Sequence, residues 1–282
     1  MFETITIVGV GLISGSLSLA LKERGLVKHV IGVSRTVKSA QKALELGLID
    51  EILSLEEAVV KSDLIYVAIP VDTTLPIMQK IMDLVTDRQI VVDAGSTKQA
   101  LCDLLDQHPM RKRFVASHPM WGTEYSGPEA AVTNAFVGRT CVICEKQKSD
   151  PEAAETVEEM YRQIGMHLIY MQAAAHDMHV AYISHISHIT SFALANTVLE
   201  KEKEEDTIFE LASGGFESTV RLAKSNPSMW VPVFMQNREN VLDVLNEHIV
   251  QLRKFKSCLE KENWEYLQQL IEGANGIKRI LK

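Results

Sequence analysis

The chain has 282 residues and a formal net charge of −8, with 29 Lys and Arg against 37 Asp and Glu. An acidic chain without a basic block is unsuited to nucleic acid or to an anionic membrane surface, so neither is expected as a partner. Hydrophobic residues at 46% and charged residues at 23% are ordinary for a globular protein and exclude long disorder. A chain of this length is typical of two domains.

The start of the chain and its cysteines indicate a cytoplasmic protein. The strand-like run Ile5–Val8 follows almost at once after Met1, so no signal peptide is expected. Four cysteines are too few for a disulfide framework, which favours a reducing compartment. Cys141 and Cys144 form one C-x-x-C in a strand-like stretch without a second ligand pair, so no metal site is expected.

Short β-branched runs alternate with helical segments up to about residue 172, which predicts an α/β fold with a mostly parallel sheet. The helical segments include Ser39–Leu46 and Leu75–Leu84. The expected strands are Ile5–Gly9, His29–Val33, Leu64–Ile69, Gln89–Asp93, Phe114–Ser117, Thr140–Cys144 and His167–Tyr170. Residues 1–172 are therefore expected to form the first domain.

The strand signal ends there, and residues 173–282 are expected to form an all-α domain. The expected helices are Ala173–Glu200, Thr207–Leu211, Phe216–Lys224, Met229–Cys258 and Asn263–Leu281. Met178–Leu199 contains no Asp, Glu, Lys or Arg, but its Ser, His, Thr and Asn side chains favour a buried helix over a membrane span. The charged tract 200–206 is expected to be a solvated connection. Apolar stripes too long for one small sheet domain to cover predict a homodimer formed through this half.

The first strand runs directly into a glycine-rich turn, Gly9-Val10-Gly11-Leu12-Ile13-Ser14-Gly15-Ser16, which opens the helix Leu17–Arg24. The two leading glycines allow a tight turn and a close backbone approach to a pyrophosphate at the helix N-terminus. The third position of the fingerprint is Ser14, with Gly15 beside it. Strand, turn and helix together favour dinucleotide binding over an unliganded turn. The expected contacts are Gly9, Gly11, Leu12 and Ile13.

The end of the second strand favours NADP over NAD. NAD-binding folds usually place an acidic residue there to bind the ribose hydroxyls, and Ser34-Arg35-Thr36 contains none. Ser34 and Thr36 can donate to a phosphate, and the Arg35 guanidinium can stack on adenine or pair with the 2′-phosphate. The plainer interpretation is that Arg35 is a surface cation.

The carboxyl ends of the other strands face the same crevice in an open parallel sheet. Ile69 and Pro70 are therefore expected beside the cofactor. Ser96 and His118 are expected close to each other and to a nicotinamide, where His118 is a candidate general base. A lone His after a strand is more often structural, and the pairing with Ser96 is what favours catalysis.

Polar residues also gather in the helical half. Ser184 and His188 are four residues apart and project from one helix face. With His176 and His179 they are satisfied core groups or, less plausibly without a converging carboxylate or cysteine, metal ligands. Arg221, one helical turn before Ser225, suits a carboxylate held bidentately, although such an arginine is more often a surface residue.

The order of these motifs resembles that of the prephenate and arogenate dehydrogenases, over essentially the whole chain. The specific part is His118-Pro119-Met120-Trp121-Gly122-Thr123-Glu124. The other matching stretches are Gly9–Ile13, Asp93–Lys98, Ser184–His188 and Arg221–Trp230. The resemblance implies a Rossmann-type dinucleotide-binding domain followed by an all-α dimerisation domain.

The resemblance further implies the oxidative decarboxylation of prephenate to 4-hydroxyphenylpyruvate in tyrosine biosynthesis, by an oxidoreductase acting on a CH–CH group with hydride transfer to NADP or NAD. His118 would take the proton of the 4-hydroxyl, while Ser96 would bond to that hydroxyl and orient His118. Arg221 matches the carboxylate clamp of the family, and Trp230 is expected to reach across the dimer. The other matching substrate-lining positions are Ser184, His188, Thr123 and Ser225.

The chain departs from the family at several positions. Trp121 replaces a small residue and is expected to narrow the pocket or cover the substrate ring. Ser187 stands where proline is frequent, and Glu217 and Ser218 replace charges that form an ion-pair gate in some members. A donor at His188 suits a keto acid side chain, which favours prephenate over arogenate.

Three alternatives are arogenate dehydrogenase, another two-domain dehydrogenase of the hydroxyacid or imino-acid type, and a non-catalytic dinucleotide sensor. Those other dehydrogenases typically use a lysine or no protein base in the helical domain, where this chain has His188 and Arg221. The set of Ser96, His118 and Arg221 argues against a sensor. With no regulatory domain expected after residue 282, tyrosine would have to act at the substrate pocket.

Overall fold

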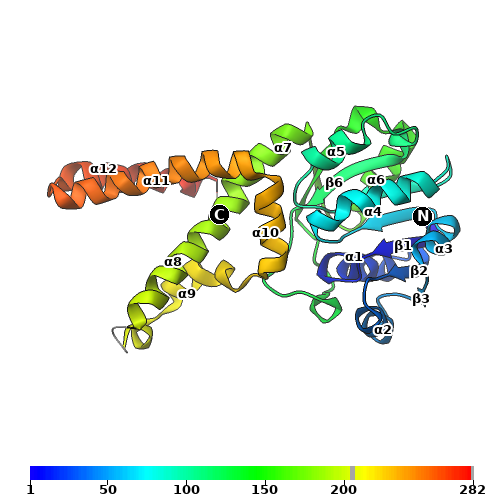
Figure 1. Cartoon of the computed structure of the whole chain (residues 1–282), viewed down its shortest axis with the longest axis horizontal. Coiled ribbons are helices and arrows are strands. Elements are labelled where there is room, and N and C mark those ends of the chain that lie inside the picture. The colour runs from blue at the N-terminus through cyan, green and yellow to red at the C-terminus, as the bar shows by residue number, and fades with distance from the viewer. Residues whose placement is uncertain (204–206, 281–282) are drawn as a thin grey trace. The chain divides into compact units, whose positions relative to one another are not determined.

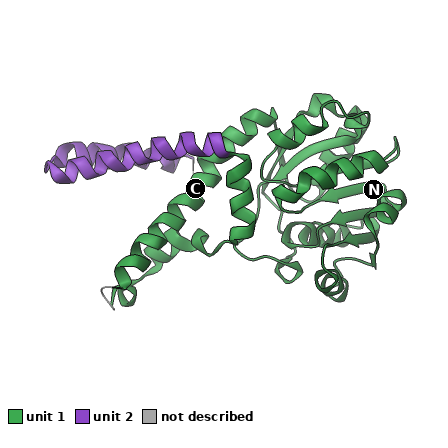
Figure 2. Ribbon diagram, in the orientation of Figure 1, with its two compact units in different colours: residues 1–237 green, residues 238–282 purple. Residues whose placement is uncertain are grey.

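The computed structural model describes residues 1–203 and 207–280 and comprises two compact units, residues 1–237 and 238–282 (Figure 2). The end of the predicted connection 200–206 and the last residue of the predicted helix Asn263–Leu281 lie outside the described residues. Within them, no helix combines the length and the apolar character that crossing a membrane requires.

One sheet of eight strands, counted over the described residues, runs through the N-terminal part in the order β3-β2-β1-β4-β5-β6-β7-β8 (Figure 1). All neighbouring strands are parallel except β6 and β7. The strands are β1 Phe2–Val8, β2 Val27–Val33, β3 Glu51–Ile52, β4 Leu64–Val67, β5 Ile90–Asp93, β6 Phe114–Pro119, β7 Thr140–Cys144 and β8 His167–Met171. The predicted α/β fold is confirmed, and only β3 was missed, because two residues are too short to show a pattern.

Helices cover both faces of this sheet. They are α1 Leu12–Glu23, α2 Val37–Glu45, α3 Leu55–Lys61, α4 Val71–Leu84, α5 Gln99–Leu105 and α6 Pro151–Gln163. In β4, Leu64 and Tyr66 join the core beneath α1, α2 and α6, while Ile65 and Val67 join the core beneath α3, α4 and α5. Both faces of the strand are apolar because both are covered.

The predicted helix Ala173–Glu200 is interrupted. The chain forms α7 Ala173–Val180, a π-helical turn Ala181–His185, and α8 Ile186–Glu202. The expectation that this stretch is buried is wrong for the single chain, since only His188 and Ser191 of α8 are buried. Within the unit, α8 packs against the segment between residues 208 and 224, and most of its other side chains are partly or fully exposed. The rest of the first unit is the 3₁₀ turns Ile208–Leu211 and Arg221–Lys224, with α9 Gly214–Val220 and α10 Pro227–Gln236.

The prediction of one helix over Met229–Cys258 is also wrong, because the helix is interrupted at Asn237. This buried residue leaves helical geometry, and its Nδ2 donates to the Asp177 carbonyl at 2.6 Å. The second unit then consists of α11 Arg238–Glu260, α12 Trp264–Ala274 and a 3₁₀ turn Asn275–Arg279.

A buried ion pair joins β5 to β6 at the carboxyl edge of the sheet. The Lys98 ammonium, fully buried, bonds to the Asp93 carboxylate and to the Ser117 carbonyl at 2.8 Å. Asp93 also accepts from the backbone N–H groups of Gly95 at 3.0 Å and Ser117 at 3.2 Å. These bonds hold the loop after β5 and the end of β6 in one arrangement.

We expect Lys98→Met to destabilise the fold by about 3–5 kcal/mol, because it leaves the Asp93 carboxylate buried without its counter-ion. Lys28→Met is the control, since Lys28 pairs with Glu3 where both side chains are 73% exposed, and such pairs contribute little. Urea unfolding at one protein concentration measures both. Equal midpoints for the two variants would show that the buried pair does not stabilise the fold.

Candidate active site

The glycine-rich turn lies between the ends of β1 and β4. Gly9 has a φ of +89°, and a Cβ there would lie 2.4 Å from the Ala68 carbonyl oxygen and 2.6 Å from Ile69, so only glycine fits. Gly11 precedes the first residue of α1, and a Cβ built on it meets nothing within 4 Å. Within the described residues no side chain caps α1 and no acidic residue occupies its first turn. Open space beside uncapped N–H groups fits a pyrophosphate.

The departure at Ser14 has a structural explanation. The Ser14 hydroxyl donates to the Gly9 carbonyl and so closes the turn. A Cβ on Gly15 would lie 2.9 Å from the Ala131 Cβ and 3.0 Å from Leu48. Gly15 therefore serves the close helix packing for which the third glycine of the fingerprint is used.

The residues predicted to bind a 2′-phosphate follow β2, which pairs in parallel with β1 up to Val8 and Val33. The Thr36 hydroxyl caps α2 by accepting from the Ser39 N–H at 3.3 Å. The Ser34 hydroxyl accepts from the Thr36 N–H at 3.4 Å, and the Arg35 side chain is exposed. These groups therefore lie at the carboxyl edge of the sheet, where the glycine-rich turn also lies.

His118 lies in β6, and its hydrogen-bond partner was not predicted. Its Nδ1 is 2.8 Å from Nε2 of His176 on α7, and the two rings meet edge to face. His176 is completely buried, and its Nδ1 is 2.7 Å from the Asp177 carboxylate. Within the described residues no hydrogen bond joins His118 to the partly buried Ser96, so the orienting role of Ser96 stays a prediction. The one signal in the sequence was that several histidines gather in the helical half, and it did not single out His176 as the partner of His118.

Burial sets the protonation of these histidines. Burial, followed by His176, Lys98 and His185, lowers the pKa of His118 well below its ordinary value. Burial also lowers the pKa of His185 to about 4. His118 is therefore a neutral base at neutral pH.

The helical side brings His188 and Trp230 together within one chain. Their rings stack at a centroid distance of 3.4 Å, and His188 Nδ1 donates to the Ser184 carbonyl at 3.0 Å. Burial lowers the pKa of His188, so its ring is neutral and its Nε2 accepts rather than donates. Trp230 is 8% exposed, and its Nε1 is buried without a partner among the described residues. A contact of Trp230 with a second subunit stays a prediction.

Arg221 is paired with the loop that follows β6 and His118. Its guanidinium lies 3.2 Å from the carboxylate of Glu124, with side-chain exposures of 52% for Arg221 and 16% for Glu124. Ser225, at the end of the same 3₁₀ turn, is buried. Thr123 is exposed and accepts from the Tyr125 N–H at 3.3 Å.

Trp121 packs against the core rather than standing free in the loop. Its ring meets Phe136 edge to face at 5.7 Å, and it contacts the core beneath α1. The expectation that Trp121 covers a substrate ring finds no support in this packing, because Phe136 offers the indole an apolar surface.

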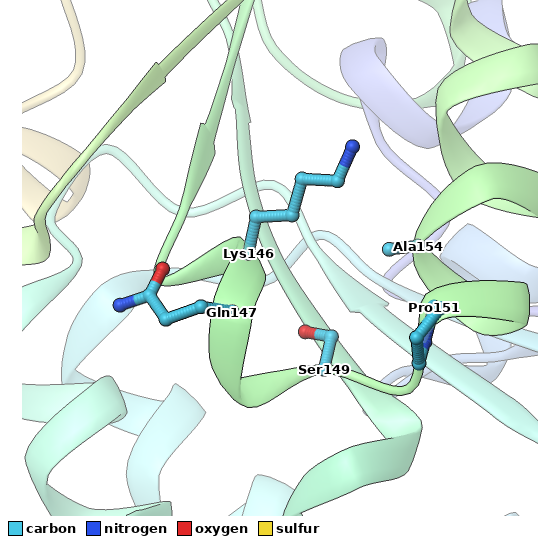
Figure 3. Close-up of a pocket in the computed structure, with 5 residues that line it drawn as sticks. All are labelled: Lys146, Gln147, Ser149, Pro151 and Ala154. Carbon is cyan, nitrogen blue, oxygen red and sulfur yellow. The ribbon is translucent and has the colours of Figure 1, made fainter.

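A surface cavity of about 410 Å³ lies beside α6 and the 3₁₀ turn Lys146–Lys148 (Figure 3). Its lining residues are Lys146, Gln147, Ser149, Pro151 and Ala154. None of them is a predicted site residue, and Lys146 is paired with Glu158 at 2.5 Å. The candidate site is therefore elsewhere, at the carboxyl edge of the sheet.

Two models of one protein family match the chain in succession. The model described as "Prephenate dehydrogenase, nucleotide-binding domain" matches residues 17–170, and "Prephenate dehydrogenase, dimerization domain" matches residues 172–273. A prephenate dehydrogenase of Bacillus subtilis is 32% identical over 277 residues, which are 97% of this chain and 75% of the relative.

Solved structures agree over the full length. Prephenate dehydrogenase from Aquifex aeolicus, in complex with hydroxyphenyl propionate and NAD+, has a TM-score of 0.90 at 30% identity, covering 99% of this chain and 98% of that one. Arogenate dehydrogenase from Synechocystis has a TM-score of 0.80 at 29% identity, covering 99% and 100%. The fold is a nucleotide-binding domain followed by a helical dimerisation domain, and the chain belongs to the prephenate dehydrogenase family.

Proposed function

We propose that this protein is a prephenate dehydrogenase that oxidises and decarboxylates prephenate to 4-hydroxyphenylpyruvate in tyrosine biosynthesis. The observation that carries the proposal is the neutral imidazole of His118 at the carboxyl edge of the sheet, with Nδ1 bonded to His176. Nε2 is then the nitrogen that can act as a base. Hydroxyphenyl propionate, bound in the Aquifex relative, shares a hydroxyphenyl ring and a side-chain carboxylate with the proposed product.

The residues of this chain divide the work as follows. His118 takes the proton of the 4-hydroxyl, Ser96 bonds to that hydroxyl, and Arg221 exchanges Glu124 for a substrate carboxylate. A bound nicotinamide would accept hydride, and loss of CO2 then makes the ring aromatic, a dehydrogenation of the CH–CH class. We assign cofactor binding to residues 1–172, and substrate binding with dimerisation to residues 173–282.

Prephenate is the preferred substrate on charge. It lacks the ammonium group of arogenate, so it brings more net negative charge to a pocket with Arg221. The neutral Nε2 of His188 accepts rather than donates, so this geometry does not support the preference for prephenate that rests on a donor at His188. Arogenate is the second candidate, because the neutral Nε2 of His188 can accept from its ammonium group.

The purified protein is expected to reduce the nicotinamide cofactor with prephenate more efficiently than with arogenate. His118→Asn should lower kcat by about 10²–10⁴-fold, the usual share of a general base. Absorbance of the reduced cofactor follows turnover, with NAD and NADP each tested. If the protein oxidises neither substrate with either cofactor, a dinucleotide sensor is favoured. An unchanged kcat in His118→Asn would show that His118 is not the general base.

The cofactor proposed is NADP, with NAD as the alternative that the Aquifex complex represents. Support comes from the end of β2, where Ser34, exposed Arg35 and Thr36 offer donors and a cation but no carboxylate. Ile69 approaches Gly9, and Pro70 begins the neighbouring helix α4 at its N-cap.

Ser34→Asp should shift the preference from NADP towards NAD, because a carboxylate repels the 2′-phosphate and accepts from the ribose hydroxyls. The ratio of kcat/KM values for the two cofactors measures the shift. Gln41→Asp, at an exposed position one turn into α2, is the control for an added charge. A variant that keeps the preference of the parent protein would refute this interpretation of the β2 end.

We propose a homodimer formed through the helical residues. Many large apolar side chains there are exposed in the single chain, and burying them is favourable. In the second unit they are Leu242, Val250, Leu252, Leu259, Trp264, Tyr266, Ile271, Ile277 and Ile280.

Light scattering should give twice the 31.5 kDa mass of one chain. Leu252→Glu, at a side chain 55% exposed on α11, should lower the mass towards that of the monomer. Val60→Glu on α3, where Val60 is 63% exposed, is the matched control and should remain dimeric. A monomeric parent protein would contradict the proposal.

A cytoplasmic location is proposed on the state of the cysteines. Cys102, Cys141, Cys144 and Cys258 are all buried free thiols. Thiols persist in a reducing compartment.

A further inference from the structure

Behind His118 lies a buried chain of two further polar side chains. His118 Nδ1, His176 Nε2, His176 Nδ1 and the Asp177 carboxylate follow one another at 2.8 Å and 2.7 Å. His176 is 0% exposed and Asp177 3% exposed. Both come from α7, which begins the helical half, whereas His118 belongs to the sheet. His176, which contacts the candidate base from a different element, is thus buried and hydrogen-bonded at both ring nitrogens.

The direction of each hydrogen bond follows from Asp177. Its carboxylate accepts from the backbone N–H groups of Lys98 at 2.7 Å and Gln99 at 3.0 Å, at the N-terminus of α5. A carboxylate held this way accepts from His176 as well, so His176 Nδ1 carries a proton and donates. The Nε2 of a neutral His176 is then an acceptor, and His118 Nδ1 must donate to it. This leaves the lone pair of His118 at Nε2.

We propose that His118, His176 and Asp177 form a proton relay in which His176 and Asp177 are positioning residues for the base. The inference rests on the proposed function. The 4-hydroxyl proton bonds to His118 Nε2, the N–H bond at His118 Nδ1 breaks, and that proton bonds to His176 Nε2. The positive charge then lies on His176, against Asp177. The relay moves protons only, and the reverse transfers followed by release from His118 to water restore it.

The charged surroundings explain why the charge moves. Lys98 from the loop before α5 and His185 from the π-helical turn disfavour a positive charge on His118. Burial lowers the pKa of His176 as well, but the hydrogen bond to Asp177 opposes this shift, so the Asp177 carboxylate favours a positive charge on His176. Asp93 of β5 pairs with Lys98 and favours a positive charge on His176, and His188 of α8 disfavours one on His185. A positive charge is therefore less unfavourable on His176 than on His118.

Imidazole N–H proton resonances test the hydrogen-bond directions without turnover. In the parent protein we expect exchange-protected resonances downfield of the amides from His118 Nδ1 and His176 Nδ1, beside the one from His188 Nδ1, which bonds to the Ser184 carbonyl. His176→Gln should remove the His176 resonance and His118→Asn the His118 resonance, and both variants should keep the one from His188. A His118 that carries its proton on Nε2 in 15N-labelled protein would overturn the relay, whatever the protein catalyses.

Two substitutions separate proton transfer from simple orientation. In His176→Gln the amide oxygen can still accept from His118 Nδ1, whereas His176→Leu offers no acceptor. If His176 passes a proton on, both variants should lower kcat by about 100-fold, with KM and cofactor affinity within about twofold of the parent values. Rescue of kcat by His176→Gln alone would overturn the relay and leave an orienting hydrogen bond.

Controls and pH dependence complete the test. His179→Gln, at an exposed position of α7, should leave kcat unchanged.

Asp177→Asn removes the charge that stabilises the protonated relay, so the acid limb of kcat/KM should move to lower pH while the plateau falls. An acid limb that stays in place in a folded Asp177→Asn protein would contradict the proposal. If the parent protein oxidises neither substrate, the proposed function fails and the resonances alone decide on the relay.

Discussion

One lysine connects the parts from which the candidate active site is built. The Lys98 side chain bonds to the Asp93 carboxylate and to the Ser117 carbonyl, next to His118. Its backbone N–H bonds to Asp177, next to His176. A single residue between β5 and α5 therefore fixes the neighbours of both histidines, and the 2.8 Å contact between their rings depends on it.

Burying the charged Lys98 side chain is energetically unfavourable, so the charge must be compensated by its pair with Asp93. Moving an ammonium and a carboxylate out of water costs several kcal/mol each, and a buried pair regains this only with good geometry and further hydrogen bonds. Here Asp93 accepts from two backbone N–H groups besides Lys98. An apolar pair of similar volume would fill the space but would provide no directional bonds to β6. We infer that the pair serves placement more than stability.

The sequence was sufficient for features that depend on neighbouring residues and insufficient for those that depend on distant ones. The strands, the turn at Gly9 and the place of His118 at a strand end follow from local patterns. The partner of His118 comes from 58 residues further along the chain, and nothing local marks it. The π-helical turn 181–185 and the break at Asn237 coincide with the tertiary bonds of Asn237 to His185 and to the Asp177 carbonyl. A regular helical period therefore predicted one continuous helix at each place where the chain forms two.

The pairing of Arg221 with Glu124 reconciles an acidic chain with an anionic substrate. The Arg221 guanidinium is 52% exposed, so its pair with Glu124 contributes little to stability. In the proposed reaction a substrate carboxylate would take the place of the Glu124 carboxylate, so little net electrostatic energy would oppose its entry. Because Glu124 lies in the loop that follows His118, the proposed exchange at Arg221 would release one contact of the segment next to the base.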